Sequence, residues 1–171
     1  MTTTTGLTHP LTLLVGSPGA NHLSLRILRR SYPDAEGFWE GNWLKVEVAV
    51  HAGAFQGRFE ADLRSDEFEH FAEQLTSAQR ASEGLATLES AEGWVKLRLA
   101  LEPRGGVEAA CEVTDDPGLG SSLRFGLSSD QAQLSDLRHA LGEVLRTFPV
   151  IGDPEEAAID LLGPLHDLEP E

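Results

Sequence analysis

The chain has 171 residues, which suits one domain with an ordinary hydrophobic core. Its 28 acidic and 13 basic side chains give a formal net charge of −15, which disfavours nucleic acid and anionic membrane as direct ligands. No apolar run is long enough to span a bilayer, we expect no signal peptide, and Cys111, the single cysteine, excludes an internal disulfide and fits a reducing cytoplasm.

The first half of the chain predicts four strands followed by a helix. Apolar and polar side chains alternate with a period of two, which indicates strands that bury one face, and Pro, Gly and Asn mark the turns between them. The period then changes to that of an amphipathic helix over 67–81, which Asp66 would cap while Glu69 reaches back to it. The predicted strands span 11–16, 23–28, 44–51 and 55–64.

The second half has the same order of elements. Four further alternating runs precede an amphipathic helix over 131–147, with Asp130 and Gln133 in the capping positions. The stretches 63–67 and 127–131 occupy matching places, which leaves open either an internal duplication or two independent choices of a good N-cap. The predicted strands span 85–89, 95–101, 107–113 and 123–127.

These patterns predict a single α+β domain over residues 1–152. Because nearly every strand alternates, we expect a mostly antiparallel, curved β-sheet with one solvated face, and the two helices would pack on its other face to make two layers. A β-α pseudo-repeat would relate the two halves. Residues 153–171 contain seven acids, three prolines and no Lys or Arg, which is typical of a mobile acidic tail with at most one loose helical turn.

The sequence contains no pattern that points to catalysis, a metal or a cofactor. The six histidines are scattered, and the group Glu69, His70 and Glu73 is typical of an exposed charged helix face. Cys111 shares the inward side of its strand with apolar residues, which predicts a buried and inert thiol. We therefore expect no enzymatic activity, no metal and no cofactor.

The stretch 39–44, Trp-Glu-Gly-Asn-Trp-Leu, holds two of the three tryptophans. Gly41–Asn42 is a turn dipeptide that accepts a positive φ, and Trp39 and Trp43 on either side of it would lie near one sheet edge. Such tryptophans either cap the core and fix the turn, or bind a partner as interface hot-spot residues do. The sequence leaves both roles open.

Together with Phe38 and the alternating strand that follows it, this stretch resembles the opening motif of the WapI family of bacterial immunity proteins. The family has Tyr and Asp where this chain has Phe38 and Glu40. The resemblance covers residues 23–152. It implies a non-enzymatic, cytoplasmic protein that binds and occludes a nuclease toxin acting on tRNA. Shorter likenesses lie at 53–57, 68–75, 92–95, 123–125, 130–131 and 148–150.

The partner that this resemblance favours is a basic toxin domain, which an acidic chain would attract by electrostatic steering. Two alternatives stay open: the acidity only confers solubility, or the chain is a ligand-binding or self-associating α+β domain, such as a homodimer, without a toxin partner. The residues predicted to contact a partner are the tryptophan stretch and acids on the polar face of the two long strands. They are Trp39, Glu40, Asn42, Trp43, Glu47, Glu60 and Asp62.

Overall fold

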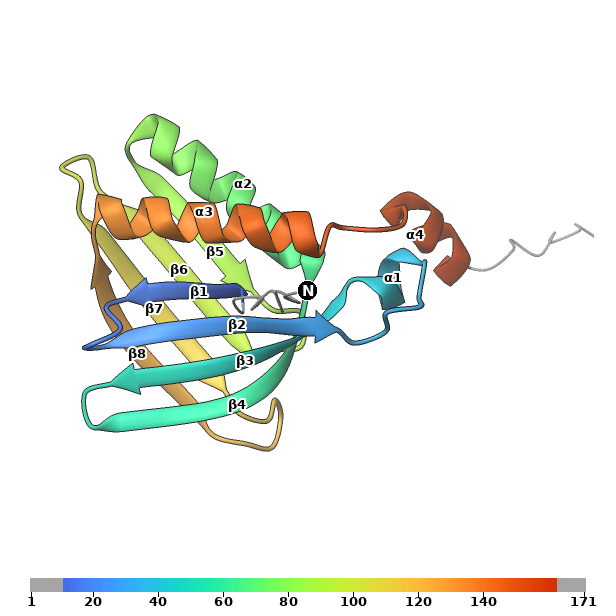
Figure 1. The fold of residues 1–171 in the computed structure, drawn as a ribbon, viewed down its shortest axis with the longest axis horizontal. Coiled ribbons are helices and arrows are strands. Elements are labelled where there is room, and N and C mark those ends of the chain that lie inside the picture. The colour runs from blue at the N-terminus through green and yellow to red at the C-terminus, as the bar shows by residue number, and fades with distance from the viewer. Residues whose placement is uncertain (1–10, 163–171) are drawn as a thin grey trace, which may run out of the picture.

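The computed structural model describes residues 11–162 and contains two four-stranded antiparallel sheets with four helices (Figure 1). The α+β, antiparallel fold expected from the sequence is confirmed, with the strands divided between two sheets. Each sheet is a meander, with strand orders β1-β2-β3-β4 and β5-β6-β7-β8. The elements are β1 (Leu11–Gly16), β2 (His22–Arg30), α1 (Phe38–Gly41), β3 (Trp43–Ala52), β4 (Phe55–Arg64), α2 (Ser65–Ala81), β5 (Gly84–Glu89), β6 (Val95–Leu101), β7 (Val107–Thr114), β8 (Ser122–Ser129), α3 (Gln131–Thr147) and α4 (Pro154–Leu162).

The two sheets lie in separate layers, and α2 and α3 lie side by side along one border of the molecule (Figure 1). Each long helix packs against a different sheet, α2 against β5 and α3 against β1. The apolar faces of the strands and helices meet in one hydrophobic cluster. Alternation explains the sheets: Leu44, Val46 and Val48 of β3 are 0% exposed, while the residues between them are half-buried on the outer face.

The two long helices begin differently. At α3 the prediction is confirmed, because Gln133 N donates to Asp130 Oδ1 at 2.8 Å and Asp130 N donates to Gln133 Oε1 at 3.2 Å. At α2 the predicted cap is wrong: the helix begins at Ser65, and its N-cap is Arg64, whose N–H donates to Glu67 Oε2 at 2.9 Å. The two caps fall at different positions of the stretches 63–67 and 127–131. The two halves therefore share the order of their elements, but the stretches 63–67 and 127–131 do not place the two helix starts at corresponding residues.

The predicted turn at Gly41–Asn42 is also wrong in its geometry. The segment Phe38–Gly41 is a short helix, and Asn42 has φ −94° and ψ −1°, a helical conformation that needs no positive φ. The glycine is required for space, because a Cβ on Gly41 would overlap the side chain of Ile151. Tertiary packing, not turn chemistry, therefore fixes this segment.

The end of the described chain is a helix. Within the segment expected to be a mobile tail, α4 contacts α1, and Ala157 is buried. Residues 163–171 lie outside the described part of the chain, so a mobile tail stays a prediction there. The division of the chain at residue 152 also stays a prediction. Among the described residues, no helix has the length and apolar character needed to cross a membrane.

Replacing Asp130 with Ala tests the cap of α3. The change removes the acceptor for Gln133 N, so we expect the free energy of unfolding to fall by about 1 kcal/mol in urea titrations followed by circular dichroism. Asp136→Ala, at an exposed position within the same helix, is the matched control and should change stability by less than about 0.5 kcal/mol. Equal losses from the two changes would contradict the assignment.

Candidate functional site

The guanidinium of Arg64 is buried beneath residues Phe38–Trp43, which we call the tryptophan segment. The residue is 3% exposed. Its Nη1 donates to the carbonyl oxygen of Trp39 at 2.6 Å, and its Nη2 donates to that of Phe38 at 3.0 Å. Its Nε donates to Asp66 Oδ1 at 2.9 Å. One carboxylate and two carbonyls of α1 thus offset the cost of burying this cation.

Three aromatic rings surround the same guanidinium. Arg64 Cζ lies 5.0 Å from the ring centroids of Phe38 and Trp43, and 5.3 Å from that of Trp39. Phe38 and Trp39 pack edge to face, with centroids 5.4 Å apart. Cation–π attraction strengthens where water is excluded, as it is here. The aromatic residues of the segment therefore enclose a buried charge.

Asn42 links the tryptophan segment to the chain that follows α3. It is 0% exposed. Its Nδ2 donates to the carbonyl oxygens of Phe38 at 2.8 Å and Ile151 at 2.9 Å, and its Oδ1 accepts from Ile151 N at 2.9 Å. Burial therefore rules out direct contact between this side chain and a partner.

Arg30 of β2 reinforces this link. Its Nη1 donates to the Gly41 carbonyl oxygen and its Nη2 to the Pro149 carbonyl oxygen, both at 2.6 Å. Its guanidinium also lies 5.9 Å from the ring centroid of Phe148. Desolvation by burial lowers the pKa of Arg30. The end of β2, the tryptophan segment and the residues after α3 are thus joined by one arginine, Arg30, and one asparagine, Asn42.

Glu67 connects the start of α2 to the second sheet. Its Oε2 accepts from Arg64 N at 2.9 Å and its Oε1 accepts from Ala91 N at 2.7 Å. Desolvation by burial raises the pKa of Glu67, and the hydrogen bonds from these two N–H groups oppose that effect. The carboxylate is therefore engaged in holding two backbone segments together.

The structure divides the predicted contact residues into three groups. Trp39, 46% exposed, and Glu40 lie on α1. Asn42 is buried beneath them. The register of β3 with β4 places the remaining four on one outer face, where Lys45 is opposite Asp62. These four are Trp43, Glu47, Glu60 and Asp62.

Most acids on this face are already paired. Glu47 accepts from Arg26 at 3.3 Å and from Arg58 at 3.2 Å. Asp62 accepts from Lys45 at 2.6 Å. This face is therefore of mixed sign. The pairs of Glu47 with Arg58 and of Asp62 with Lys45 could have been found from sequence, because a two-residue turn after Ala52 fixes the register of this hairpin.

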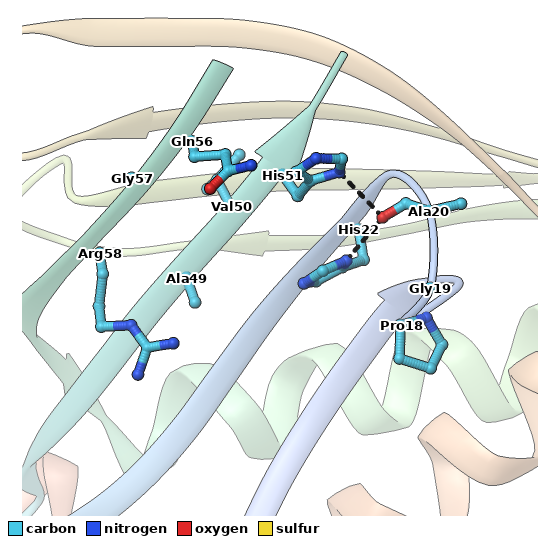
Figure 2. A pocket seen from close by; sticks show the side chains of 10 residues that line it. All are labelled: Pro18, Gly19, Ala20, His22, Ala49, Val50, His51, Gln56, Gly57 and Arg58. Carbon is cyan, nitrogen blue, oxygen red and sulfur yellow. Dashed lines mark hydrogen bonds between the residues drawn. The ribbon is translucent and has the colours of Figure 1, made fainter. Parts of the chain in front are cut away.

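Two shallow depressions lie on this outer face. One, of about 340 Å³, brings Trp43 and Asp62 together with Arg29 and Tyr32. The other, of about 490 Å³, lies at the opposite end, beside the β1–β2 turn, and is shown in Figure 2. Its lining includes a histidine pair that the sequence did not single out, because only strand pairing brings β2 next to β3.

The histidine pair has a defined tautomer. The rings of His22 and His51 stack with centroids 6.0 Å apart. Both Nδ1 atoms approach the Ala20 carbonyl oxygen, at 2.8 and 3.1 Å, as Figure 2 shows. A carbonyl can only accept, so each Nδ1 carries a proton, and each neutral ring keeps Nε2 as an acceptor. Within the described residues, no three His, Cys, Asp or Glu side chains form a cluster that could hold a metal.

Cys111 is a structural residue. It is 4% exposed, and desolvation by burial raises the pKa of its thiol to about 12. At neutral pH the thiol is protonated and screened from solvent. The prediction of a buried thiol is confirmed, and its raised pKa agrees with the predicted lack of reactivity.

Comparisons with known proteins find one family. The model of the Immunity protein WapI-like family matches residues 13–149. No curated protein matches the chain. Similar solved structures include the plant transcriptional regulator PBF-2 (14% identity, 89% of this chain and 89% of that chain covered, TM-score 0.47). They also include WHY1 from Arabidopsis thaliana (13% identity, 95% of this chain and 97% of that chain covered, TM-score 0.49). These two structures are too distant to bear on function.

Replacing Arg64 with Met tests the buried cation. The change removes the donor that Arg64 provides to the Trp39 carbonyl and to the Asp66 carboxylate, and one of the two donors to the Phe38 carbonyl, so we expect the free energy of unfolding to fall by about 3 kcal/mol. Arg58→Met is the matched control, since this side chain is 70% exposed, and it should cost less than about 1 kcal/mol. Urea unfolding measures both. A loss at Arg64 no larger than that at Arg58 would show that the buried arginine does not hold the segment.

Proposed function

Because the chain belongs to the Immunity protein WapI-like family, we propose that it antagonises a toxin by binding the toxin domain and occluding it. The family match over residues 13–149 is the observation that carries this proposal, since it spans both sheets and both long helices. The toxin domain is basic and acts as a nuclease on tRNA. Antagonism requires complementary surfaces and no chemical step, and both proteins meet in the cytoplasm.

The contact surface in this proposal joins α1 to the outer face of β3 and β4. Trp39 provides a large aromatic side chain whose neighbourhood is held rigid by Arg64 below it. A fixed, partly exposed tryptophan suits a hot spot, because little conformational entropy is lost when it is covered. Trp43 and Asp62 line the adjacent depression. Glu40, Glu47 and Glu60 complete the surface, and Asn42 supports it from beneath.

Charge contributes to this proposal at two ranges. The net charge of −15 attracts a basic domain from a distance and raises the association rate at low salt. At contact the surface is mixed, because Glu47 and Asp62 are paired with Arg26, Arg58 and Lys45. A partner that fits must offer both signs in matching places, which gives specificity rather than general attraction.

The proposal predicts that a toxin domain is encoded beside this chain, and the test uses that domain. Co-expression should restore growth of cells that produce the toxin, and the purified proteins should form a complex that weakens as salt rises. Trp39→Ala should raise Kd at least tenfold, which corresponds to about 1.4 kcal/mol. Leu119→Ala is the matched control: Leu119 is 90% exposed in the loop after β7, and its loss should leave Kd unchanged. Circular dichroism confirms that both variants fold.

Two outcomes would contradict parts of this proposal. If Trp39→Ala binds as tightly as the original chain, the contact surface lies elsewhere. If the chain neither restores growth nor binds the neighbouring toxin domain, antagonism itself fails.

A further inference from the structure

The strand β4 is an open edge of the first sheet. It is hydrogen-bonded to β3 alone and forms a border of that sheet in Figure 1. The other edges have neighbours: β1 lies against α3 and β8, and β5 lies against α2. The first half of β4 is open to solvent, since Phe55 is 64% exposed and residues 56–58 are exposed as well. An edge strand with free N–H and C=O groups can accept another strand.

The charges of β4 are complementary to a second copy of β4. If two copies run antiparallel about a two-fold axis at Phe59, Arg58 of each copy lies opposite Glu60 of the other. Both residues are on the outer face, so the two cross-strand pairs form on the same side of the sheet. Gly57 then lies opposite Ala61, so small residues flank the axis. The arrangement is isologous, as a two-fold dimer requires.

A cation next to Glu60 would be stabilising. On its own sheet, Glu60 lies directly opposite Glu47 of β3, and two like charges in opposite positions destabilise a sheet. Glu47 receives both Arg26 and Arg58, and Asp62 receives Lys45, whereas Glu60 has no ion pair within the described residues. A cation on the open side of β4 would offset the repulsion. Arg58 of a second copy provides one, because its side chain is 70% exposed.

The inner side of the edge is apolar. A cavity of about 440 Å³ opens between the start of β4 and the second sheet, and Phe55, Phe59, Val113 and Leu123 are among the residues that line it. The two Phe59 residues would lie opposite each other at the axis, on the side of this cavity, where each half-buried ring stacks on Trp94 of its own chain with centroids 6.3 Å apart. Covering the exposed ring of Phe55 favours association.

We propose that two copies of the chain associate through β4, antiparallel about a two-fold axis at Phe59, and so join their first sheets into one. The dimer is a property of the chain alone and does not rest on toxin binding. Glu60 also belongs to the proposed toxin surface, so a toxin and a second copy would compete for it.

Reciprocal charge changes test this dimer. Light scattering after gel filtration and sedimentation equilibrium on the full chain, without toxin, should show a concentration-dependent dimer. Arg58→Glu and Glu60→Arg should each raise the dimer Kd at least tenfold, because each places like charges opposite each other twice. The double variant R58E/E60R restores opposite pairs and should return the Kd toward its original value. Arg104→Glu, in the β6–β7 turn, is the control for a general change of charge and should leave the Kd unchanged.

A monomer at every concentration overturns the proposal, as does a dimer whose Kd the single changes leave unaltered. A double variant whose dimer Kd is as high as that of the single variants also overturns it. If the chain is monomeric and the β4 variants lose only toxin binding, the edge belongs to the toxin. Because the measurement contains no toxin, failure of the dimer and failure of toxin antagonism are separate results.

Discussion

The burial of the Arg64 guanidinium is the constraint on which the tryptophan segment depends. A cation that is 3% exposed costs several kcal/mol unless hydrogen bonds replace its hydration. Two carbonyls of the single helical turn α1, one carboxylate and three rings meet this need. A helix of four residues has little stability of its own, so α1 depends on the hydrogen bonds that its carbonyls accept from Arg64. The tryptophans enclose a charge, and Gly41 lets the chain after α3 approach.

The same segment links the first half of the chain to the residues that follow α3. Asn42 holds Ile151 through both polar atoms of its side chain, and Arg30 holds Pro149, so the first sheet is fastened to the residues that follow α3. A consequence for binding follows from this arrangement. Trp39 is partly exposed on a segment that buried hydrogen bonds hold in place, and a pre-ordered aromatic side chain loses little entropy in a complex. A structural role for the segment thus supports a binding role and does not compete with it.

Alternation located every strand to within one or two residues, because each strand buries one face. Alternation could not show that the strands form two sheets, because it indicates which side chains a strand buries and not which strand it pairs with. The sequence found the cap of α3 but missed that of α2, where Asp66 and Glu69 offered a false alternative to Arg64 and Glu67. The exposed positions of Trp39 and Glu40 allow the contact role predicted for them, which no observation tests. Asn42 was not recognised as buried, because its partner Ile151 is 109 residues away.

Native-state hydrogen exchange of the Ile151 amide tests the central claim most directly, namely that the tryptophan segment holds the residues after α3. This N–H donates to the Asn42 side chain. In Asn42→Ala we expect the protection of this amide to fall at least tenfold, because it loses its hydrogen-bond acceptor and can then exchange through local opening. Amides in the middle of α3 should keep their protection. Unchanged protection of Ile151, or an equal loss throughout α3 and both sheets, would contradict the account.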